Sequence, residues 1–588
     1  MRNHIIMTLF LPAALLSLPV AALSQAQQEA KVDAIFARYN RSDSPGCALG
    51  VIRDGRMIYA RGYGIANLEH GIPIGARTIF DLGSTSKQFT AACIVLLAQE
   101  GKLSYDDDIR KFVPEMPDYG SRITVRHLLH HASGLRDYLA LMSLAGVDFD
   151  GITTEEDALR LIARQRELNF KPGDEHLYSN SGYFLLSIIV QRASGKSLSQ
   201  YAQERIFGPL VMKDTHLHND HTRIVQNRAT GYAPNRSGGF QIDMSGFEQT
   251  GDGAVMTSVE DLLLWDENFY QPRVGGEALI AQLHSTGMLN DGEKLRYAFG
   301  LTVSEYRGLK TVNHGGSWAG YRAELLRFPE QKFSVACLCN LASADPSRLA
   351  RQVSEVYLAD HMKPQAAADE PGKEVRQVSI SAQEAAKYVG LYRNPVSGDL
   401  RRVSFADGRL RMDAFGAPLE LAPLEPGTFR VGGPASETTA IFDRAGSAGG
   451  VRLQLKRQAG KPEIYAAVRP AAPSEPELGA YEGVFFSPEL EVQYSVVLEG
   501  GKLFLRGRNL PKDALQPTFG DGFALAGRFL EFRRDASGRV SGFLVQAGRI
   551  RNVRFERRVK SVAELSPTDV PVCEIGPTCQ RPIPLSGP

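Results

Sequence analysis

The 588-residue sequence has no excess of charge of either sign, since 67 Lys and Arg residues face 66 Asp and Glu residues. A nucleic-acid-binding protein normally carries a basic excess or stripe, so nucleic acid is not expected as a partner. Six cysteines are too few for a fold that depends on a disulfide framework. Beyond the first 23 residues, no apolar run approaches the ~20 residues that cross a bilayer. We therefore expect no membrane span after this segment.

Two common hydrolase signatures are also missing. The sequence contains no Gly-x-Ser-x-Gly motif, which argues against the nucleophile elbow of an α/β-hydrolase. It contains no His-Glu-x-x-His motif, so the common zinc-peptidase signature is absent. Hydrophobic residues make up 43% and charged residues 23%, an ordinary globular balance. At roughly 150 residues per domain, the length suggests about three or four domains.

The N-terminus has the pattern of an export signal. Arg2 precedes an apolar run from Ile5 to Leu23, and Ser24-Gln25-Ala26 offers small residues where a signal peptidase cuts. We predict a signal peptide over residues 1–26 and a periplasmic or secreted protein. A membrane anchor is the alternative; two prolines within the run and the polar residues after it favour the signal peptide.

Cysteines of an exported protein can pair. Cys573 and Cys579 flank a Gly-Pro turn, and the sequence predicts a small disulfide loop there. Cys337 and Cys339 alternate on an expected strand and therefore point to one face. Two further cysteines lie in apolar segments and are expected to be buried, inert thiols: Cys47 and Cys93.

Residues 27–362 show an α+β pattern. Strands with hairpin turns are expected near both ends, and apolar residues at helical spacing predict a helix over 84–100, which stops at Gly101. A second apolar helix is expected over about 181–193. The expected strands are 46–52, 57–62, 321–328 and 333–339. Strands near the two ends and helices between them favour one α+β domain.

The rest of the chain has a different pattern. A linker rich in Ala, Pro and charge is expected over 363–380, and a polar tail over 559–588. Between them, short alternating segments repeat: Tyr388 to Tyr392 resembles Tyr481 to Phe485, and residues 408–412 resemble 501–505 at the same spacing. The pattern predicts two small antiparallel β-barrels, over 381–470 and 478–558.

A nucleophile and a base lie at the start of the first predicted helix. Ser84 and Lys87 form a Ser-x-x-Lys motif, and positions i and i+3 share one helix face, so hydroxyl and amine can meet. The helix N-terminus favours negative charge developing at the serine, and the Ser84 N–H can donate to an oxyanion. By chance the motif occurs about once or twice in such a chain, so it needs support.

Two further segments supply that support. Tyr178-Ser179-Asn180 precedes the second apolar helix, where a phenol can relay a proton and an amide can hold a substrate carbonyl. His314-Gly315-Gly316-Ser317 closes one strand of the expected C-terminal hairpins, and its glycines allow a substrate backbone to approach closely. Together with Ser84 these segments predict a covalent serine hydrolase.

With these motifs in place, residues 30–345 resemble the penicillin-binding-protein and class C β-lactamase family of serine hydrolases. The resemblance includes Pro45-Gly46, Thr78 to Phe80, His131 to Leu135 and Gly251 to Ala254. Ser133 to Tyr138, together with a catalytic domain followed by two barrels, is similar to the D-aminopeptidases of that family. The resemblance implies a β-lactamase/transpeptidase-like α+β domain followed by two lipocalin-like barrels.

The resemblance also implies roles for particular residues. Ser84 would be the nucleophile, Lys87 its base and Tyr178 a second acid/base. Substrate contacts would come from Asn180, His314, Gly316 and Ser317. His314 stands where family members have the lysine of Lys-Thr-Gly, and the N–H groups of Ser84 and Ser317 would form the oxyanion hole. Lys87 can act as a base only if burial, or a cation such as protonated His314, lowers its pKa.

The expected substrate class follows from the positions at which this sequence departs from the family pattern. His314-Gly315 offers only a weakly basic imidazole where the family holds a substrate carboxylate, which disfavours a dedicated β-lactamase or DD-carboxypeptidase. We expect a small or D-configured peptide amide or an ester as substrate, with a carboxylic-ester hydrolase or weak β-lactamase as alternative. A non-catalytic receptor for penicillin or cell-wall peptides is the alternative of another class. The sequence does not fix the oligomeric state.

Two further expectations concern recognition of the substrate amine. The resemblance to D-aminopeptidases implies a long loop that extends from the last barrel toward the cleft. Here the matching hairpin turns over Gly527-Arg528, too short to cover a cleft, so amine recognition from it is not expected. Asp252 is a substitute, although a loop carboxylate is more often a cap or turn residue.

Two histidine clusters offer a rival metalloenzyme hypothesis. His216-Leu217-His218-Asn219-Asp220-His221 matches the zinc motif of metallo-β-lactamase-like hydrolases, but that fold needs further histidines downstream. We expect an exposed loop with adventitious metal affinity here, and no metal or cofactor in the active site. A second cluster is expected to serve packing or capping: His127, His130 and His131.

Overall fold

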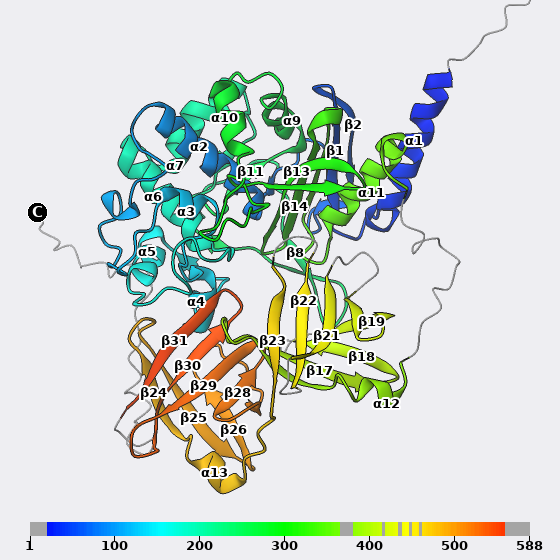
Figure 1. Cartoon of the computed structure of the whole chain (residues 1–588). Coiled ribbons are helices and arrows are strands. Elements are labelled where there is room, and N and C mark those ends of the chain that lie inside the picture. The colour runs from blue at the N-terminus through cyan, green and yellow to red at the C-terminus, as the bar shows by residue number, and fades with distance from the viewer. Residues whose placement is uncertain are drawn as a thin grey trace, which may run out of the picture.

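Six antiparallel strands form the central sheet of the N-terminal domain in the computed structural model (Figure 1), which describes residues 20–364, 380–413, 418–432, 438–445, 450–457 and 461–558. The order is β12-β13-β14-β15-β1-β2, so β1 near the start of the domain pairs with β15 near its end. The strands are β1 Cys47–Arg53, β2 Arg56–Tyr63, β12 Thr302–Tyr306, β13 Leu309–Trp318, β14 Tyr321–Phe328 and β15 Phe333–Cys339. The two predicted hairpins are confirmed.

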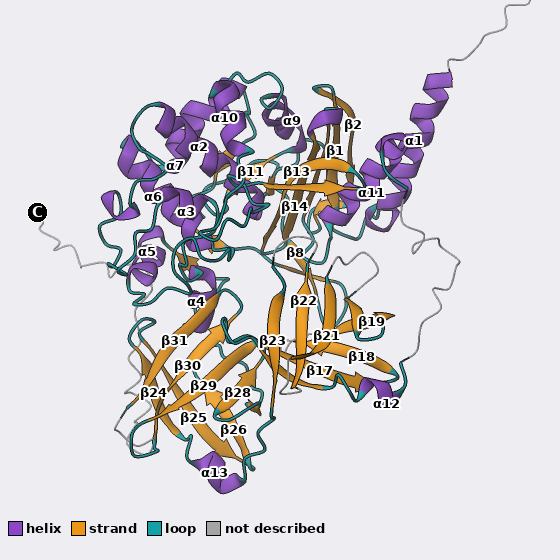
Figure 2. Ribbon diagram, in the orientation of Figure 1, coloured by secondary structure: helices purple, strands orange, loops and turns teal. Residues whose placement is uncertain are grey.

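Helices cover both faces of this sheet (Figure 2). One face packs against α1 Val20–Phe36 and α11 Pro346–Leu358. The other face joins a core with α2 Lys87–Gln99, α6 Asn180–Ser194, α9 Val259–Glu267 and α10 Gly276–Leu283. Because both faces are covered, β1 and β15 are apolar and buried along nearly their whole length.

Shorter elements complete the N-terminal domain. The remaining helices are α3 Val125–Leu129, α4 Tyr138–Leu144, α5 Glu155–Ala163, α7 Leu198–Ala202 and α8 Gly208–Leu210. The short strands are β3 Ile65–Asn67, β4 Ile72–Pro73, β5 Phe80–Asp81, β6 Ile152–Thr153, β7 His216–Leu217, β8 Tyr232–Pro234, β9 Phe240–Ile242, β10 Gly246–Phe247 and β11 Val255–Thr257. None of the helices in the described ranges has the length and apolar character that a bilayer crossing requires.

Two eight-stranded barrel-shaped domains follow, as the internal repeat predicts (Figure 1). The first begins with α12 Ala382–Ala385 and closes by pairing β16 with β23. Its strands are β16 Gly390–Arg393, β17 Leu400–Ala406, β18 Arg409–Asp413, β19 Leu419–Glu425, β20 Thr428–Val431, β21 Thr439–Ala445, β22 Gly450–Lys456 and β23 Glu463–Val468. Apolar side chains such as Tyr392, Phe429 and Tyr465 form its core.

The second barrel packs directly against the helices of the N-terminal domain, and its core is continuous with theirs. It begins with α13 Glu475–Gly479. Its strands are β24 Gly483–Ser487, β25 Val492–Glu499, β26 Lys502–Arg506, β27 Gln516–Pro517, β28 Gly522–Leu525, β29 Arg528–Arg534, β30 Val540–Ala547 and β31 Ile550–Arg557. Tyr494 donates a hydrogen bond to the carbonyl of Leu144 in α4. This barrel is therefore close enough to place side chains beside those of the N-terminal domain.

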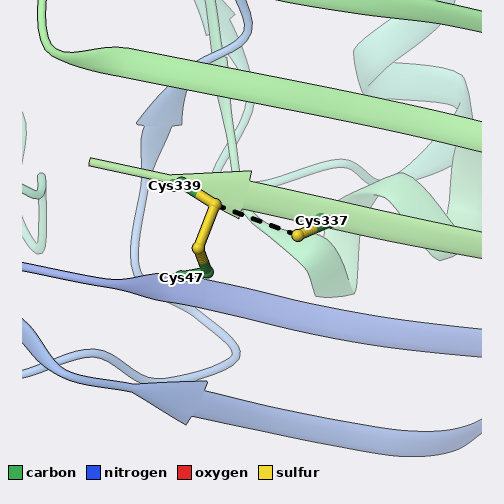
Figure 3. A group of neighbouring side chains, drawn as sticks. All are labelled: Cys47, Cys337 and Cys339. Atoms are coloured by element: carbon green, nitrogen blue, oxygen red, sulfur yellow. Dashed lines mark hydrogen bonds between the residues drawn. A yellow bond between two sulfur atoms is a disulfide. The ribbon is translucent and has the colours of Figure 1, made fainter. Parts of the chain in front are cut away.

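The prediction for Cys47 is wrong, because it forms a disulfide with Cys339 (Figure 3). The two residues are directly opposite each other on β1 and β15, with Cα atoms 4.0 Å apart. Cys337 lies on the same face of β15 as Cys339, as predicted, and its Sγ is 3.9 Å from that of Cys339. Cys93 is a buried free thiol. The pairing was missed because the sequence does not show that β1 and β15 are neighbours.

Several predictions concern residues without a described placement. Cys573, Cys579 and the tail over 559–588 lie outside the described residues, as does most of the linker, over 365–379. The predicted cleavage point after Ala26 falls within α1, which starts at Val20. The signal peptide stays a prediction.

Candidate active site

Ser84 and Lys87 meet where the helix begins. Ser84 lies in the 3₁₀ turn η2 Gly83–Ser86, and α2 continues from Lys87, so hydroxyl and amine share one face as the spacing predicts. Lys87 is fully buried, and its Nζ lies 3.1 Å from Ser84 Oγ, 3.0 Å from Asn180 Oδ1 and 2.6 Å from the Asp252 carbonyl oxygen. Three oxygens therefore fix the amine beside the serine.

Burial lowers the pKa of Lys87 to about 8, although the negative charges of Asp252 and Asp137 oppose the shift. Arg549 adds to the lowering. An amine with a pKa near neutrality is available in its free-base form to accept the Ser84 proton. The electrostatics therefore suit Lys87 to the role of general base.

The Tyr178 ring lies against the Lys87 amine. Its ring centre lies 4.9 Å from Lys87 Nζ, and its hydroxyl is buried without a hydrogen-bond partner among the described groups. Burial raises the pKa of Tyr178, although the nearby Ser84 hydroxyl and Arg549 lower it in part. The phenol is therefore protonated at neutral pH and has a proton to give.

The loop with Ser133 to Tyr138 fixes the second catalytic segment. Asn180 is the first residue of α6, and its N–H donates to Asp137 Oδ2 at 2.8 Å. Tyr138 donates to Asp252 Oδ2 at 3.1 Å, and burial raises the pKa of Asp252 to about 6. The His131 ring lies 4.1 Å from the Tyr178 ring. Tyr178 and Asn180 are thus held by buried neighbours.

Strand β13 brings the oxyanion-hole segment against η2. A methyl group on Gly316 would lie 1.8 Å from the Leu82 carbonyl oxygen, so only glycine fits there. Gly83 has a φ of +48°, and a methyl group on it would lie 2.7 Å from the Ser317 nitrogen. The N–H of Ser317 therefore lies beside the segment that carries Ser84, as an oxyanion hole requires.

His314 does not act as the cation that we considered as a cause of a low Lys87 pKa. Its Nε2 lies 3.0 Å from the Tyr297 hydroxyl and its Nδ1 lies 2.6 Å from the Gly315 carbonyl oxygen. Burial lowers the pKa of His314 to about 4, so the ring is neutral at neutral pH. A neutral ring in this arrangement donates from Nδ1 to Gly315 and accepts from Tyr297 at Nε2. The low pKa of Lys87 therefore comes mainly from burial, with Arg549 rather than His314 as the assisting cation.

These groups line one cleft of about 650 Å³. The predicted site residues on its wall are Ser84, Tyr178, Asn180, His314, Gly316 and Ser317. Asp252 also lines the cleft, while the Lys87 amine reaches Ser84 from behind it. The structure therefore brings the whole predicted set together.

Sequence reasoning missed Arg549. The Phe523–Phe532 hairpin turns over Ala526-Gly527, one residue earlier than predicted, and does not line the cleft. The next hairpin does: Arg549 follows Gly548 in the β30–β31 turn and lies on the cleft wall. Its guanidinium carbon is 4.6 Å from the Tyr178 ring centre. No local motif marks this arginine, so only tertiary structure reveals it.

The first histidine cluster is only partly the exposed loop that we expected, since His216 and Leu217 form β7 and His218 is buried. His221 Nδ1 is 2.7 Å from Glu248 Oε1, and with Asp220 these residues form a surface group whose ligand atoms lie within 4.8 Å of one another. His218 lines the cleft. The prediction for the second cluster is confirmed, since His127 Nδ1 caps α3 by accepting from the N–H of Thr124.

Comparisons with known proteins agree with this geometry. The sequence profile of the family described as Beta-lactamase matches residues 32–358. A D-aminopeptidase of Gluconobacter oxydans (strain 621H) is 32% identical over 320 residues, which cover 54% of this chain and 59% of that relative. The match to that relative therefore spans less than two thirds of its length.

Two further matches extend beyond the N-terminal domain. A D-aminopeptidase of Brucella canis (strain ATCC 23365 / NCTC 10854 / RM-666) is 26% identical over 545 residues, covering 90% of this chain and 98% of the relative. The octameric penicillin-binding protein homologue from Pyrococcus abyssi superposes with a TM-score of 0.53 at 25% identity, covering 75% of this chain and 99% of that chain.

Proposed function

The chain belongs to the β-lactamase family, and from this premise we propose that it is a serine hydrolase that cleaves amide bonds of small D-configured peptides. The observation that carries the proposal is the contact between Ser84 and Lys87 in a cleft that also holds Tyr178. The preference for D-configured substrates is supported by the D-aminopeptidases that resemble the chain, one over 54% and one over 90% of its length.

Acylation follows from the positions of these groups. The free amine of Lys87 takes the Ser84 proton while Oγ attacks the substrate carbonyl carbon. The N–H groups of Ser84 and Ser317 hold the negative oxygen that forms. Tyr178 gives its proton to the leaving nitrogen as the amide bond breaks, and the acyl group stays on Ser84 as an ester.

Deacylation returns the enzyme to its starting state. The Tyr178 phenolate left by acylation removes a proton from water, and the resulting hydroxide attacks the ester carbonyl. Ser84 leaves as the alkoxide and recovers its proton from protonated Lys87, and the product is a carboxylic acid. The Asn180 side chain holds the Lys87 amine. The same amide group also holds the substrate carbonyl.

We also propose that the protein is exported and works in the periplasm or outside the cell. The predicted signal peptide over residues 1–26 supports this proposal. The Cys47–Cys339 disulfide adds support, because disulfides persist in oxidising compartments. N-terminal sequencing of the protein from a periplasmic extract tests it: a chain starting at Gln27 is expected, and a cytoplasmic chain with residues 1–26 intact would contradict it.

A panel of substrates tests the hydrolase proposal. D-alanine p-nitroanilide, its L-enantiomer, p-nitrophenyl acetate and nitrocefin separate amidase, esterase and β-lactamase activity. We expect turnover of the D-anilide well above the L-anilide, with all turnover lost in Ser84→Ala. Faster turnover of the acetate or nitrocefin than of the D-anilide would favour an esterase or β-lactamase. Acylation without turnover on every substrate would indicate a receptor.

A further inference from the structure

Arg549 places a cation from another domain into the catalytic cleft. It occupies the tip of the β30–β31 hairpin of the second barrel, yet lines the same cleft as Ser84. Its guanidinium carbon lies 4.6 Å from the ring centre of Tyr178, and 46% of its side chain is exposed. The group is therefore placed beside the reacting atoms and remains open to a ligand.

The hairpin that carries Arg549 is fixed to the N-terminal domain. Asn169 donates from Nδ2 to the Arg549 carbonyl at 2.9 Å and accepts at Oδ1 from the Arg551 N–H at 2.8 Å. The Asp137 N–H lies 3.5 Å from the same Arg549 carbonyl. Gly548, with a φ of +54°, makes the tight turn before it. A ligand would therefore meet a positioned guanidinium.

The Arg549 guanidinium has N–H groups that are not used in hydrogen bonds to the described residues. Arg549 forms an ion pair with Asp137, in which Nη1 and Oδ2 are 3.6 Å apart, a separation longer than a hydrogen bond. The two Asp137 oxygens already accept the N–H groups of Ala140 and Asn180. Within the described ranges the Arg549 side chain donates no hydrogen bond, although a guanidinium has five N–H groups in a fork that matches a carboxylate.

The Lys87 amine and Arg322 already have hydrogen-bond partners. The Lys87 amine has three oxygen partners around it. Arg322 donates to the carbonyls of Ala319 and Tyr321. Arg228 lies near the buried Asp81 carboxyl and lowers its pKa in part. Of the three arginines on the cleft wall, Arg549 is the one that lies over the Tyr178 ring.

We propose that Arg549 binds the free carboxylate of the leaving amino acid, so that the enzyme prefers peptides with a free C-terminal carboxylate over amides that lack one. Tyr178 shows which part of the substrate Arg549 would meet. Its hydroxyl delivers a proton to the leaving nitrogen, and Arg549 lies against its ring, so Arg549 is on the leaving-group side of the cleft. Arg549 thus supplies the carboxylate contact that His314 cannot make. The inference rests on the proposed hydrolase function and names the substrate class of that same site.

The test compares two substrates that differ only in this group. The kcat/KM ratio of D-alanyl-D-alanine to D-alanyl-D-alaninamide is measured for wild type, Arg549→Gln and Arg549→Lys. Because any disturbance of Tyr178 affects both substrates, the ratio isolates the carboxylate contact. Arg554→Gln is the matched control, since Arg554 lies on β31, the strand that follows Arg549, and pairs with Glu167 away from the cleft.

We expect wild type to favour the free acid and Arg549→Gln to lower the ratio by about tenfold to a hundredfold, the usual worth of a charged hydrogen bond. Arg549→Lys should retain part of the ratio, and Arg554→Gln all of it. An unchanged ratio in Arg549→Gln, or its loss in Arg228→Gln instead, would overturn the inference while leaving the hydrolase proposal intact. Failure of wild type to cleave either substrate or to form an acyl-Ser84 adduct would overturn both.

Discussion

Arg136 and Glu489 form a buried ion pair between the N-terminal domain and the second barrel, with Nη1 and Oε1 2.8 Å apart. The Arg136 side chain is fully buried, and it also donates to the carbonyls of Arg551 and Asn552 in β31. The next residue, Asp137, holds the N–H of Asn180. The loop that carries Arg136 and Asp137 therefore contacts both the second barrel and the active site.

Replacing Arg136 by Met is expected to destabilise the protein by about 3–5 kcal/mol, because Glu489 is left as an unpaired buried charge. Denaturant midpoints measure the effect. The control is Arg554→Gln, whose exposed pair with Glu167 should cost less than about 1 kcal/mol. Equal destabilisation by the two variants would contradict the role of the buried pair.

The pH dependence follows from Lys87. Its pKa of about 8 means that below this pH the amine is mostly protonated and cannot take the Ser84 proton. At pH 6 we expect kcat/KM about a hundredfold below its plateau, since about 1% of the amine is free. Asp252→Asn removes a charge that raises the pKa of Lys87, so the rising limb should move to lower pH. A movement to higher pH would contradict this account.

Tyr178→Phe is expected to lower kcat by roughly two to four orders of magnitude, the usual worth of acid–base help. Its stability should stay close to that of wild type, because the buried hydroxyl has no hydrogen-bond partner among the described groups to lose. Tyr183→Phe is the matched control: it loses a bond to the Leu129 carbonyl, so stability should fall while most activity remains. Steady-state kinetics and thermal melting separate the two effects.

The disulfide gives a prediction about connectivity and stability. Peptide mapping without reduction should recover Cys47 linked to Cys339, with Cys337 and Cys93 alkylated only after unfolding. Cys47→Ser should lower the unfolding free energy by about 2–4 kcal/mol, typical for a disulfide that closes a long loop. Cys337→Ala should leave the link intact. A Cys337–Cys339 link in the native protein would contradict the structure.

The sequence was informative wherever the chemistry is local. Ser84 and Lys87 are one helical turn apart, so their contact follows from helix geometry alone. The barrels follow from a repeat that the chain itself displays. Arg549 and the Cys47–Cys339 bond are different, because each depends on which distant segments become neighbours. The sequence shows that glycines surround His314, but only the packing of β13 against η2 shows why Gly316 has no room for a side chain.

The most direct test of the central claim is labelling of the nucleophile. Wild type, Ser84→Ala, Lys87→Ala and the cleft-lining control Ser245→Ala are treated with a fluorophosphonate, and the modified peptide is identified by mass spectrometry. We predict an adduct on Ser84 in wild type and Ser245→Ala and none in Ser84→Ala. Labelling of Lys87→Ala should be slower by about two to four orders of magnitude, since the hydroxyl then lacks its base. An adduct on another residue, or labelling of Lys87→Ala at the wild-type rate, would contradict the mechanism.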